Sequence, residues 1–429
     1  MKKLLKKFIE KKLRNYSKKI LDKYHPDIIG ITGSVGKTSA KEAIALVLLS
    51  EYNVRKNIKN YNNEIGLPLT IIGSESGGKS IAQWLKIFSI AKKIIKESAE
   101  YPEALVLEMG ADRPGDISYL TKFIKCKVGV VTAVGRSHLE FFETINNIAK
   151  EKGRLAESIG LGGYVILNAD DERVSTMRSK TKAKVITCGF LGSADLQASD
   201  VRIGGGNNGN GNGNGISFKL KYKNNIIPVA LPHILGEHFV YAALYAIAVG
   251  IVYEIPIISI VNSLKKFESP AGRMKLINGI KNTKIIDDTY NSSLQSAESA
   301  LRTLKSVSGK KKYAVLGDML ELGAESEKDH KKAGKFVKEF GCDILITVGE
   351  RSRDTAKSAE GAGMARDFIF SFGNTEEAGK FLQERILEGD VILVKGSQGM
   401  RMERIVKEIM AEPLKAPELL VRQGEEWMK

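Results

Sequence analysis

Cysteine is scarce in this chain, and the positions of the few thiols exclude two common uses. Only three occur among the 429 residues, at Cys126, Cys188 and Cys342, and each lies alone in an apolar stretch. They provide neither the paired spacing of a zinc site nor a disulfide framework, and such a pattern is typical of a reducing cytoplasm.

Long hydrophobic runs are also lacking. The longest, residues 239–253, is shorter than the roughly 20 residues that span a bilayer, so we expect a buried helix there. Charged residues interrupt the first 25 positions every few residues, which denies them the apolar core of a signal peptide. We therefore expect a cytoplasmic protein.

Negative charge is in deficit. The chain has 66 lysines and arginines against 50 acidic residues, a net charge of +16, which favours anionic partners such as nucleotides or an acidic membrane. Nucleic acid is not expected as a partner, because the excess is scattered and no aromatic and basic side chains alternate as in single-strand-binding platforms.

The most informative segment that is present reads Ile28-Ile-Gly-Ile-Thr-Gly-Ser-Val-Gly-Lys-Thr-Ser39. An apolar, strand-like run enters a glycine-rich turn and then a helix, which is the pattern of a phosphate-binding loop. Ile31 replaces the first glycine of the general motif. We expect the phosphates of ATP to be bound by the residues of this turn, namely Gly33, Ser34, Val35, Gly36, Lys37, Thr38 and Ser39. Lys37 would offset phosphate charge, and the Thr38 hydroxyl would bind Mg²⁺.

Two series of apolar runs alternate with helical patterns, which predicts an α/β protein. The first series predicts strands at 28–32, 104–108, 128–134, 164–168 and 185–188, and the second at 284–287, 312–316, 343–348 and 391–394. We expect a P-loop parallel-sheet ATPase domain over 28–268, followed by a Rossmann-like α/β domain over 269–412. Residues 204–215 consist entirely of Gly and Asn and are expected to form a flexible hairpin tip without chemistry, and residues 413–429 a loosely packed tail.

Two segments outside this scheme predict basic amphipathic helices. Residues 2–24 and 79–96 each place apolar side chains on one helical face, including Trp84 and Phe88, with lysines elsewhere. Two interpretations remain open. The helices pack on each other or on the ATPase domain, or their apolar stripes rest on an anionic membrane.

Ordered motifs along residues 28–410 resemble those of the ATP-dependent Mur ligases. In the first half these are Asn60-Tyr-Asn-Asn-Glu-Ile-Gly-Leu-Pro-Leu-Thr70, Leu107-Glu-Met-Gly-Ala-Asp-Arg-Pro-Gly-Asp-Ile117, Ser137-His-Leu-Glu140 and Ile148-Ala-Lys-Glu-Lys-Gly153. In the second half they are Gly272-Arg273, Asp287-Asp-Thr-Tyr-Asn291, Leu316-Gly-Asp-Met-Leu-Glu-Leu-Gly323 and Val394-Lys-Gly-Ser397.

The resemblance implies a mechanism and a set of roles. ATP would convert a carboxylate to an acyl phosphate, which an amine then attacks, with two Mg²⁺ ions offsetting the negative charge. Thr38 would hold the first ion, and Glu108, His138 and a carbamate formed on Lys152 the second. Lys150 is close by, but the motif favours the second lysine. The resemblance also implies nucleotide contacts by Arg273 and Asp288, and substrate contacts by Asn62, Asn63, Asn291, Lys395 and Ser397.

The family resemblance implies addition of D-alanyl-D-alanine, or a related amine, to a muramoyl-peptide precursor by a monomeric enzyme. Two alternatives remain: a ligase of the same fold for another carboxylate and amine pair, such as a folylpolyglutamate-type ligase, and a degenerate ATP-binding module.

Three departures bear on this choice. Phe239 and Ala242 stand where the family has asparagines that contact adenine, and the segment Tyr290-Asn-Ser-Ser-Leu294 differs from the family's pattern. In addition, only 27 residues precede the first predicted strand, so we expect the family's N-terminal uridine-binding domain to be missing.

Overall fold

The computed structural model describes residues 2–58, 61–98, 100–135, 139–203, 215–424 and 427, without the side chains of 2–4 and 139. By internal contacts the chain divides into two compact units. The first consists of residues 1–200, 218–229 and 240–264, and the second of residues 201–217, 230–239 and 265–429. Each unit is described by itself.

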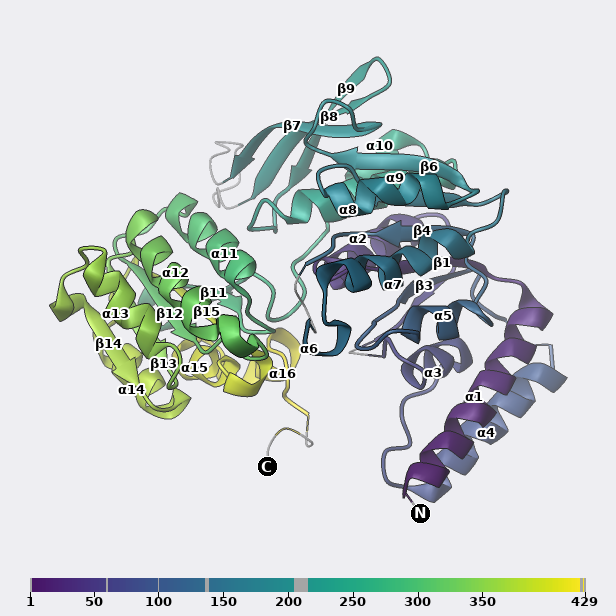
Figure 1. The fold of residues 1–429 in the computed structure, drawn as a ribbon, viewed down its shortest axis with the longest axis horizontal. Coiled ribbons are helices and arrows are strands. Elements are labelled where there is room, and N and C mark those ends of the chain that lie inside the picture. The colour runs from purple at the N-terminus through teal and green to yellow at the C-terminus, as the bar shows by residue number, and fades with distance from the viewer. Residues whose placement is uncertain are drawn as a thin grey trace. The chain divides into compact units, whose positions relative to one another are not determined.

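A nine-stranded sheet organises the first unit (Figure 1), in the order β2-β3-β1-β4-β5-β6-β7-β8-β9. Its strands are β1 (Asp27–Thr32), β2 (Val54–Lys56), β3 (Ala104–Glu108), β4 (Val128–Val131), β5 (Tyr164–Asn168), β6 (Lys184–Gly189), β7 (Leu196–Ile203), β8 (Ile216–Tyr222) and β9 (Asn225–Leu231). All pairs from β2 to β7 are parallel. The expectation of a parallel α/β sheet is confirmed.

The central strands are buried on both faces because helices cover them, which is why they appear in the sequence as continuous apolar runs. Helices α2 (Lys37–Leu48) and α7 (Ile145–Ser158) pack against strands, and α5 (Asp116–Thr121) packs on α7. The apolar run at 239 forms the buried helix α9 (Phe239–Val252), as predicted. Within the described part of the chain, no helix is both long and apolar enough to cross a bilayer.

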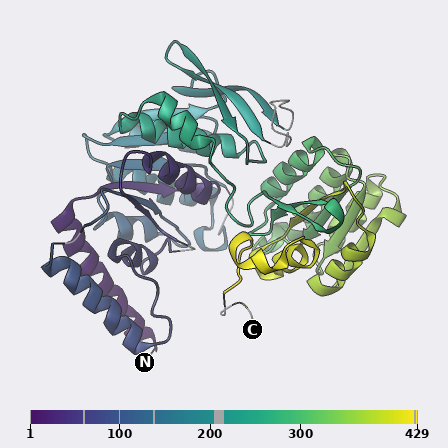
Figure 2. The same cartoon turned by 180° about the vertical axis from the view of Figure 1, so that it is seen from behind.

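The two basic helices lie side by side, as both views show (Figures 1 and 2). They are α1 (Lys2–Tyr24) and α4 (Ile81–Lys96), and α3 (Gly66–Ile72) packs against both. The pair is parallel, because the Tyr16 and Phe88 rings lie 5.8 Å apart while the Tyr24 hydroxyl donates to the carbonyl of Ile94. Trp84 is 8% exposed and belongs to the core. Trp84 therefore faces protein, which fits the interpretation that the helices pack on each other, while contact of the helix pair with a membrane stays a prediction.

A six-stranded sheet forms the centre of the second unit, in the order β10-β11-β15-β12-β13-β14. Its strands are β10 (Lys275–Asn278), β11 (Lys284–Asp288), β12 (Lys312–Gly317), β13 (Ile344–Val348), β14 (Ile369–Phe372) and β15 (Val391–Lys395). Only β10 runs antiparallel to its neighbour. The flanking helices are α11 (Leu294–Ser306), α12 (Ser326–Glu339), α13 (Arg353–Gly361), α14 (Thr375–Arg385) and α15 (Glu403–Ile409).

Residues 416–422 are packed on the second unit, which corrects the expectation of a loose tail for this part of the chain. Ala416, in α16 (Ala416–Leu419), is 0% exposed, and Leu420 joins the apolar core of the second unit. Arg422 pairs with the buried carboxylate of Glu403 at 2.9 Å and also donates to the carbonyl of Tyr290. Its charge is thus satisfied by a buried partner, and burial of the preceding apolar residues holds the segment in place.

Candidate active site

The glycine-rich turn connects β1 to α2 and has the backbone geometry that its glycines predict. Gly36 precedes α2 with φ of 82°, in the left-handed region that favours glycine. At Gly33, with φ of 149°, an added Cβ would lie 1.9 Å from the Thr132 hydroxyl. That hydroxyl donates to the carbonyl of Val35 at 2.6 Å, so the next strand along the sheet supports the loop.

Lys37, the first residue of α2, holds its ammonium group against the loop. Its Nζ donates to the carbonyl of Gly33 at 2.8 Å and lies 3.4 Å from the carbonyl of Ser34. The positive charge is therefore held over a turn at a helix N-terminus, where backbone N–H groups and the helix dipole favour an anion.

Thr38 and Glu108 meet although 70 residues separate them in the sequence. The Thr38 hydroxyl donates to Oε2 of Glu108 at 2.9 Å, and Asn62 Nδ2 donates to Oε1 of the same carboxylate at 3.3 Å. Sheet register brings this about, since Ile31 of β1 pairs with Glu108 of β3, and the carboxyl ends of both strands lie at one edge. Three of the predicted site residues are thus brought together.

Asn57 holds the backbone of Glu108 and was not predicted. It is 0% exposed, its Oδ1 accepts the backbone N–H of Glu108 at 2.8 Å, and its Nδ2 donates to the carbonyl of Tyr61 at 3.2 Å. One side chain thereby ties the end of β3 to the loop that carries Asn62. No sequence motif marks it; its only signal is an asparagine directly after a short strand.

Lys152, on α7, is a buried amine at 3% exposure, whereas Lys150 is exposed. Burial, followed by the charge of Lys37, lowers the pKa of Lys152 to about 7, against the opposing effect of Glu151 and Asp112. The Glu151 carboxylate accepts the backbone N–H groups of Gly115 and Ile117. The structure thus distinguishes the two neighbouring lysines that the sequence leaves close together.

One other predicted residue, Asn63, does not join this group. His138 lies outside the described residues. Asn63 uses its Oδ1 to accept the backbone N–H groups of Ile65 and Gly66, at the start of α3. Among the described residues, no three His, Cys, Asp or Glu side chains gather where they could hold a metal ion.

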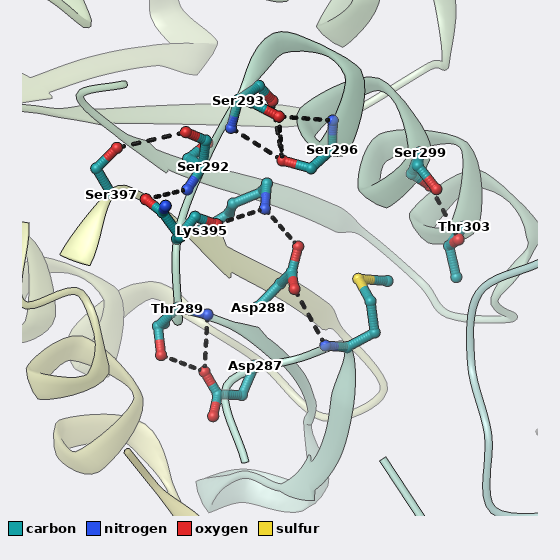
Figure 3. Close-up of polar contacts among 12 residues, drawn as sticks. Asp287, Asp288, Thr289, Ser292, Ser293, Ser296, Ser299, Thr303, Lys395 and Ser397 are labelled. Atoms are coloured by element: carbon teal, nitrogen blue, oxygen red, sulfur yellow. Dashed lines mark hydrogen bonds and ion pairs between the residues drawn. The ribbon is translucent and has the colours of Figure 1, made fainter. Parts of the chain in front are cut away.

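A second polar cluster lies at the carboxyl ends of β11 and β15 in the second unit (Figure 3). Lys395, 1% exposed, donates to Asp288 Oδ2 at 2.6 Å and to the carbonyl of Asn291 at 2.9 Å. Asp288 Oδ1 accepts the backbone N–H of Met274. Parallel pairing of Asp288 with Lys395 places these residues opposite one another, so the charges offset each other in a buried position.

Two further predicted residues of the second unit, Arg273 and Ser397, have partners of their own. The Arg273 guanidinium lies 3.9 Å from the centre of the Tyr290 ring, within cation–π distance. Ser397 Oγ accepts the backbone N–H of Leu320 at 2.8 Å and donates to the carbonyl of Ser292 at 3.4 Å. The cluster is therefore held by main-chain as well as side-chain contacts.

The two residues that replace the family's asparagines lie in apolar surroundings. Phe239 is 0% exposed, with its ring 6.0 Å from that of Phe267, and Ala242 is 3% exposed. Both positions therefore serve packing in this chain.

The phosphate-binding loop lies beside the Glu108 carboxylate at the carboxyl ends of parallel strands, where open α/β sheets bind ligands. This arrangement identifies an α/β protein that binds nucleotide phosphates. Residues 31–83 and 86–250 match the Mur ligase middle domain, and residues 272–398 match the Mur ligase, glutamate ligase domain. The chain belongs to the Mur ligase family, whose members are ATP-dependent ligases that form amide bonds.

Several relatives carry the name UDP-N-acetylmuramoyl-tripeptide–D-alanyl-D-alanine ligase. The protein from Bacillus subtilis is 31% identical over 406 residues, which cover 94% of this chain and 80% of the relative. That from Escherichia coli is 28% identical, over 89% of this chain and 76% of the relative. MurF ligase from Thermotoga maritima, solved in complex with ADP, shares the fold with a TM-score of 0.75 and 24% identity, over 93% of this chain and 83% of that chain.

Proposed function

We propose that this protein adds D-alanyl-D-alanine to a UDP-linked muramoyl tripeptide, with ATP as co-substrate, in the cytoplasm and as a monomer. The observation that carries the proposal is the contact between Thr38 and Glu108 beside the Lys37 loop. The relatives that bear this activity in their names cover most of the chain, including both ligase domains. We propose residues 28–268 as the central ATP-binding domain and 269–412 as the C-terminal one.

Thr38 and Glu108 would hold one magnesium ion. Mg²⁺ prefers oxygen ligands, and the hydroxyl and the carboxylate are both of that kind. Their oxygens lie 2.9 Å apart. Both would therefore hold the same ion, rather than the separate ions that the resemblance implied. When bound, the ion supplies charge neutralisation for the phosphates.

The residues of the first unit would prepare ATP for attack by the donor carboxylate. The turn from Gly33 to Ser39 binds the phosphates, and Lys37 neutralises charge that develops as the γ-phosphoryl group moves. A carboxylate oxygen of the donor attacks the γ-phosphorus and ADP leaves, giving an acyl phosphate. The amine of the acceptor then attacks the acyl carbon, and phosphate leaves with the shared oxygen.

We propose that the Lys152 amine carries a carbamate. A pKa of about 7 leaves much of the amine neutral at physiological pH. The neutral nitrogen attacks the carbon of CO₂ and loses a proton, so the neutral side chain becomes negative. The ammonium form, which Lys37 repels, is thereby replaced by an anion that Lys37 attracts, and the carbamate supplies two oxygens. Together with His138, the carbamate would hold the second Mg²⁺ ion.

In the second unit, we propose that Arg273 and Asp288 contact the nucleotide, and that Asn291, Lys395 and Ser397 position substrate. The Asp288–Lys395 ion pair fixes the loop that carries Asn291. Asn62, whose side chain donates to the Glu108 carboxylate, and Asn63 would contact the donor substrate. We further propose that the protein associates peripherally with the anionic inner face of the membrane.

The experiment is ATP-dependent phosphate release with a panel of donors and acceptors. UDP-muramoyl tripeptide with D-alanyl-D-alanine is expected to give phosphate and an amide product in equal amounts. Omitting either substrate should abolish product. Glutamate with a folate donor is the control for the other ligase type, and activity with that pair alone would overturn the proposal.

A further inference from the structure

Four exposed apolar side chains lie at one end of the α1–α4 pair. Leu5 and Phe8 on α1 are 47% and 53% exposed, and Ile81 and Leu85 on α4 are 66% and 62% exposed. Because the helices are parallel, these residues all lie toward the N-terminal end of the pair (Figure 1). We call these four residues the apolar tip.

The rest of the pair hides its apolar side chains. Leu13 and Ile20 on α1 are 0% exposed, and Trp84 and Ile87 on α4 are at most 8% exposed. Packing of the helices on each other and on α3 therefore accounts for the stripes but not for the tip. Apolar side chains that the fold leaves exposed at one end of a helix pair indicate a binding surface.

Positive charge surrounds the apolar tip. Helix α1 has ten lysines and arginines against two acidic residues, which is half of the net charge of the whole chain. Lys7, Lys11 and Lys12 are exposed, and Lys12 Nζ lies 5.6 Å from the centre of the Phe8 ring. On α4, the exposed Lys86 follows Leu85 directly.

An ion pair connects the apolar tip to the loop that carries Asn62. Lys6, between the two α1 tip residues, pairs with Glu64 at 3.0 Å. Glu64 is two residues from Asn62, whose side chain donates to Glu108. A surface bound at the tip would therefore lie near the loop that leads to the proposed donor site.

We propose that the apolar tip and its surrounding lysines dock on an anionic lipid bilayer. Lysine is depleted at protein–protein interfaces, whereas lysines around exposed Leu and Phe are typical of segments that insert shallowly into anionic lipid. The lysine stems can lie along the acyl region while the ammonium groups reach the phosphates. The apolar tip would be the surface for the membrane association proposed above, whichever substrates the enzyme ligates.

The test compares three full-length proteins in vesicle co-sedimentation, with phosphatidylcholine alone and with added phosphatidylglycerol. The tip variant carries Leu5→Ser, Phe8→Ser, Ile81→Ser and Leu85→Ser. A matched control changes four apolar side chains of similar or greater exposure elsewhere, with Leu161→Ser, Ile226→Ser, Ile258→Ser and Leu387→Ser, exposed by 76%, 62%, 66% and 60%. Thermal unfolding and ligation of a water-soluble donor report on the fold of each variant.

The wild type and the matched control are expected to pellet with anionic vesicles, less so at high salt, and not with phosphatidylcholine alone. The tip variant should show a partition coefficient lower by about tenfold or more, with melting and soluble-donor ligation retained. Pelleting of the tip variant equal to that of the wild type would overturn the proposal. So would a lipid-free dimer that the tip variant dissociates, since the surface would then bind a second copy. If all three proteins lacked ligation activity while the wild type and the matched control still pelleted with anionic vesicles, the proposed ligase activity would be contradicted but the docking surface would not.

Discussion

The Thr38 hydroxyl and the Glu108 carboxylate lie 2.9 Å apart at the carboxyl edge of a parallel sheet. The first oxygen comes from the helix that follows the phosphate loop, and the second from the end of the neighbouring strand. A hydrogen bond holds the two oxygens together, where both would be available to one Mg²⁺ ion.

Replacing Thr38 tests this arrangement. Thr38→Val keeps the side-chain shape but removes the hydroxyl, so we expect kcat/KM to fall by about 100-fold or more, because metal-assisted charge stabilisation is worth several kcal/mol. Thr38→Ser keeps the hydroxyl and should retain most activity. The measurement is initial rate against Mg²⁺ concentration for each variant. Equal magnesium dependence in the wild type and the valine variant would remove Thr38 from the metal site.

Lys37→Ala should abolish ligation and leave the fold intact. The ammonium group contacts the carbonyls of Gly33 and Ser34 in the loop, and its charge is needed where phosphate charge develops. We expect a loss of at least about 100-fold in kcat, with unchanged circular dichroism and a melting temperature close to that of the wild type. Near-normal turnover would contradict the ATP-dependent mechanism.

Lys152→Ala should be inactive, and short-chain carboxylic acids should restore part of the activity by occupying the position of the carbamate. Lys150→Ala is the matched control, because that side chain is exposed two residues away, and it should behave as the wild type. Activity of the Lys152 variant without added acid would show that the carbamate is wrongly assigned.

The pH dependence of carbamate formation follows from the same lysine. Burial and Lys37 lower the pKa of Lys152 to about 7, so the reactive neutral amine predominates above that pH. Uptake of carbon-13 bicarbonate, followed by NMR, should rise through pH 7 and be absent in Lys152→Ala. An ordinary lysine would instead show its rise near pH 10. Because the folded protein binds fewer protons at this site between about pH 7 and 10.4, the lysine's contribution to stability increases with pH over that range.

The Asp288–Lys395 pair predicts non-additive effects on stability. Lys395→Met leaves a largely buried carboxylate without its cation and should lower the unfolding free energy of the second unit by about 3–5 kcal/mol. Adding Asp288→Asn removes the stranded charge and should recover part of this loss without restoring ligation. Calorimetry of both single variants and the double variant measures the coupling. Additive losses would mean that the two side chains stabilise the unit independently.

Much of the fold was predictable because its strands are buried on both faces. Residues 104–108 and 164–168 form strands at the predicted bounds, since each apolar run ends where polar residues begin. The edge strand at 54–56 was not predicted. It has three residues, two of them charged, and pairing with β3 rather than its own composition makes it a strand.

The site was predictable where its residues form local motifs. Lys37 and Thr38 follow directly from the glycine-rich turn. Asn57 does not, because its role is to bind the backbone of Glu108, 51 residues away, and only strand pairing brings the two together. The Trp84 stripe shows a related limit, since periodicity predicts an apolar face but not whether protein or lipid covers it.

The central claim is ligation through an acyl phosphate, and the most direct test follows the donor oxygen. UDP-muramoyl tripeptide labelled with oxygen-18 in its terminal carboxylate is incubated with ATP, Mg²⁺ and D-alanyl-D-alanine, and the released phosphate is analysed by mass spectrometry. We predict ADP as the nucleotide product and one labelled oxygen in the phosphate for each amide formed. Unlabelled phosphate, or AMP with pyrophosphate, would contradict the account.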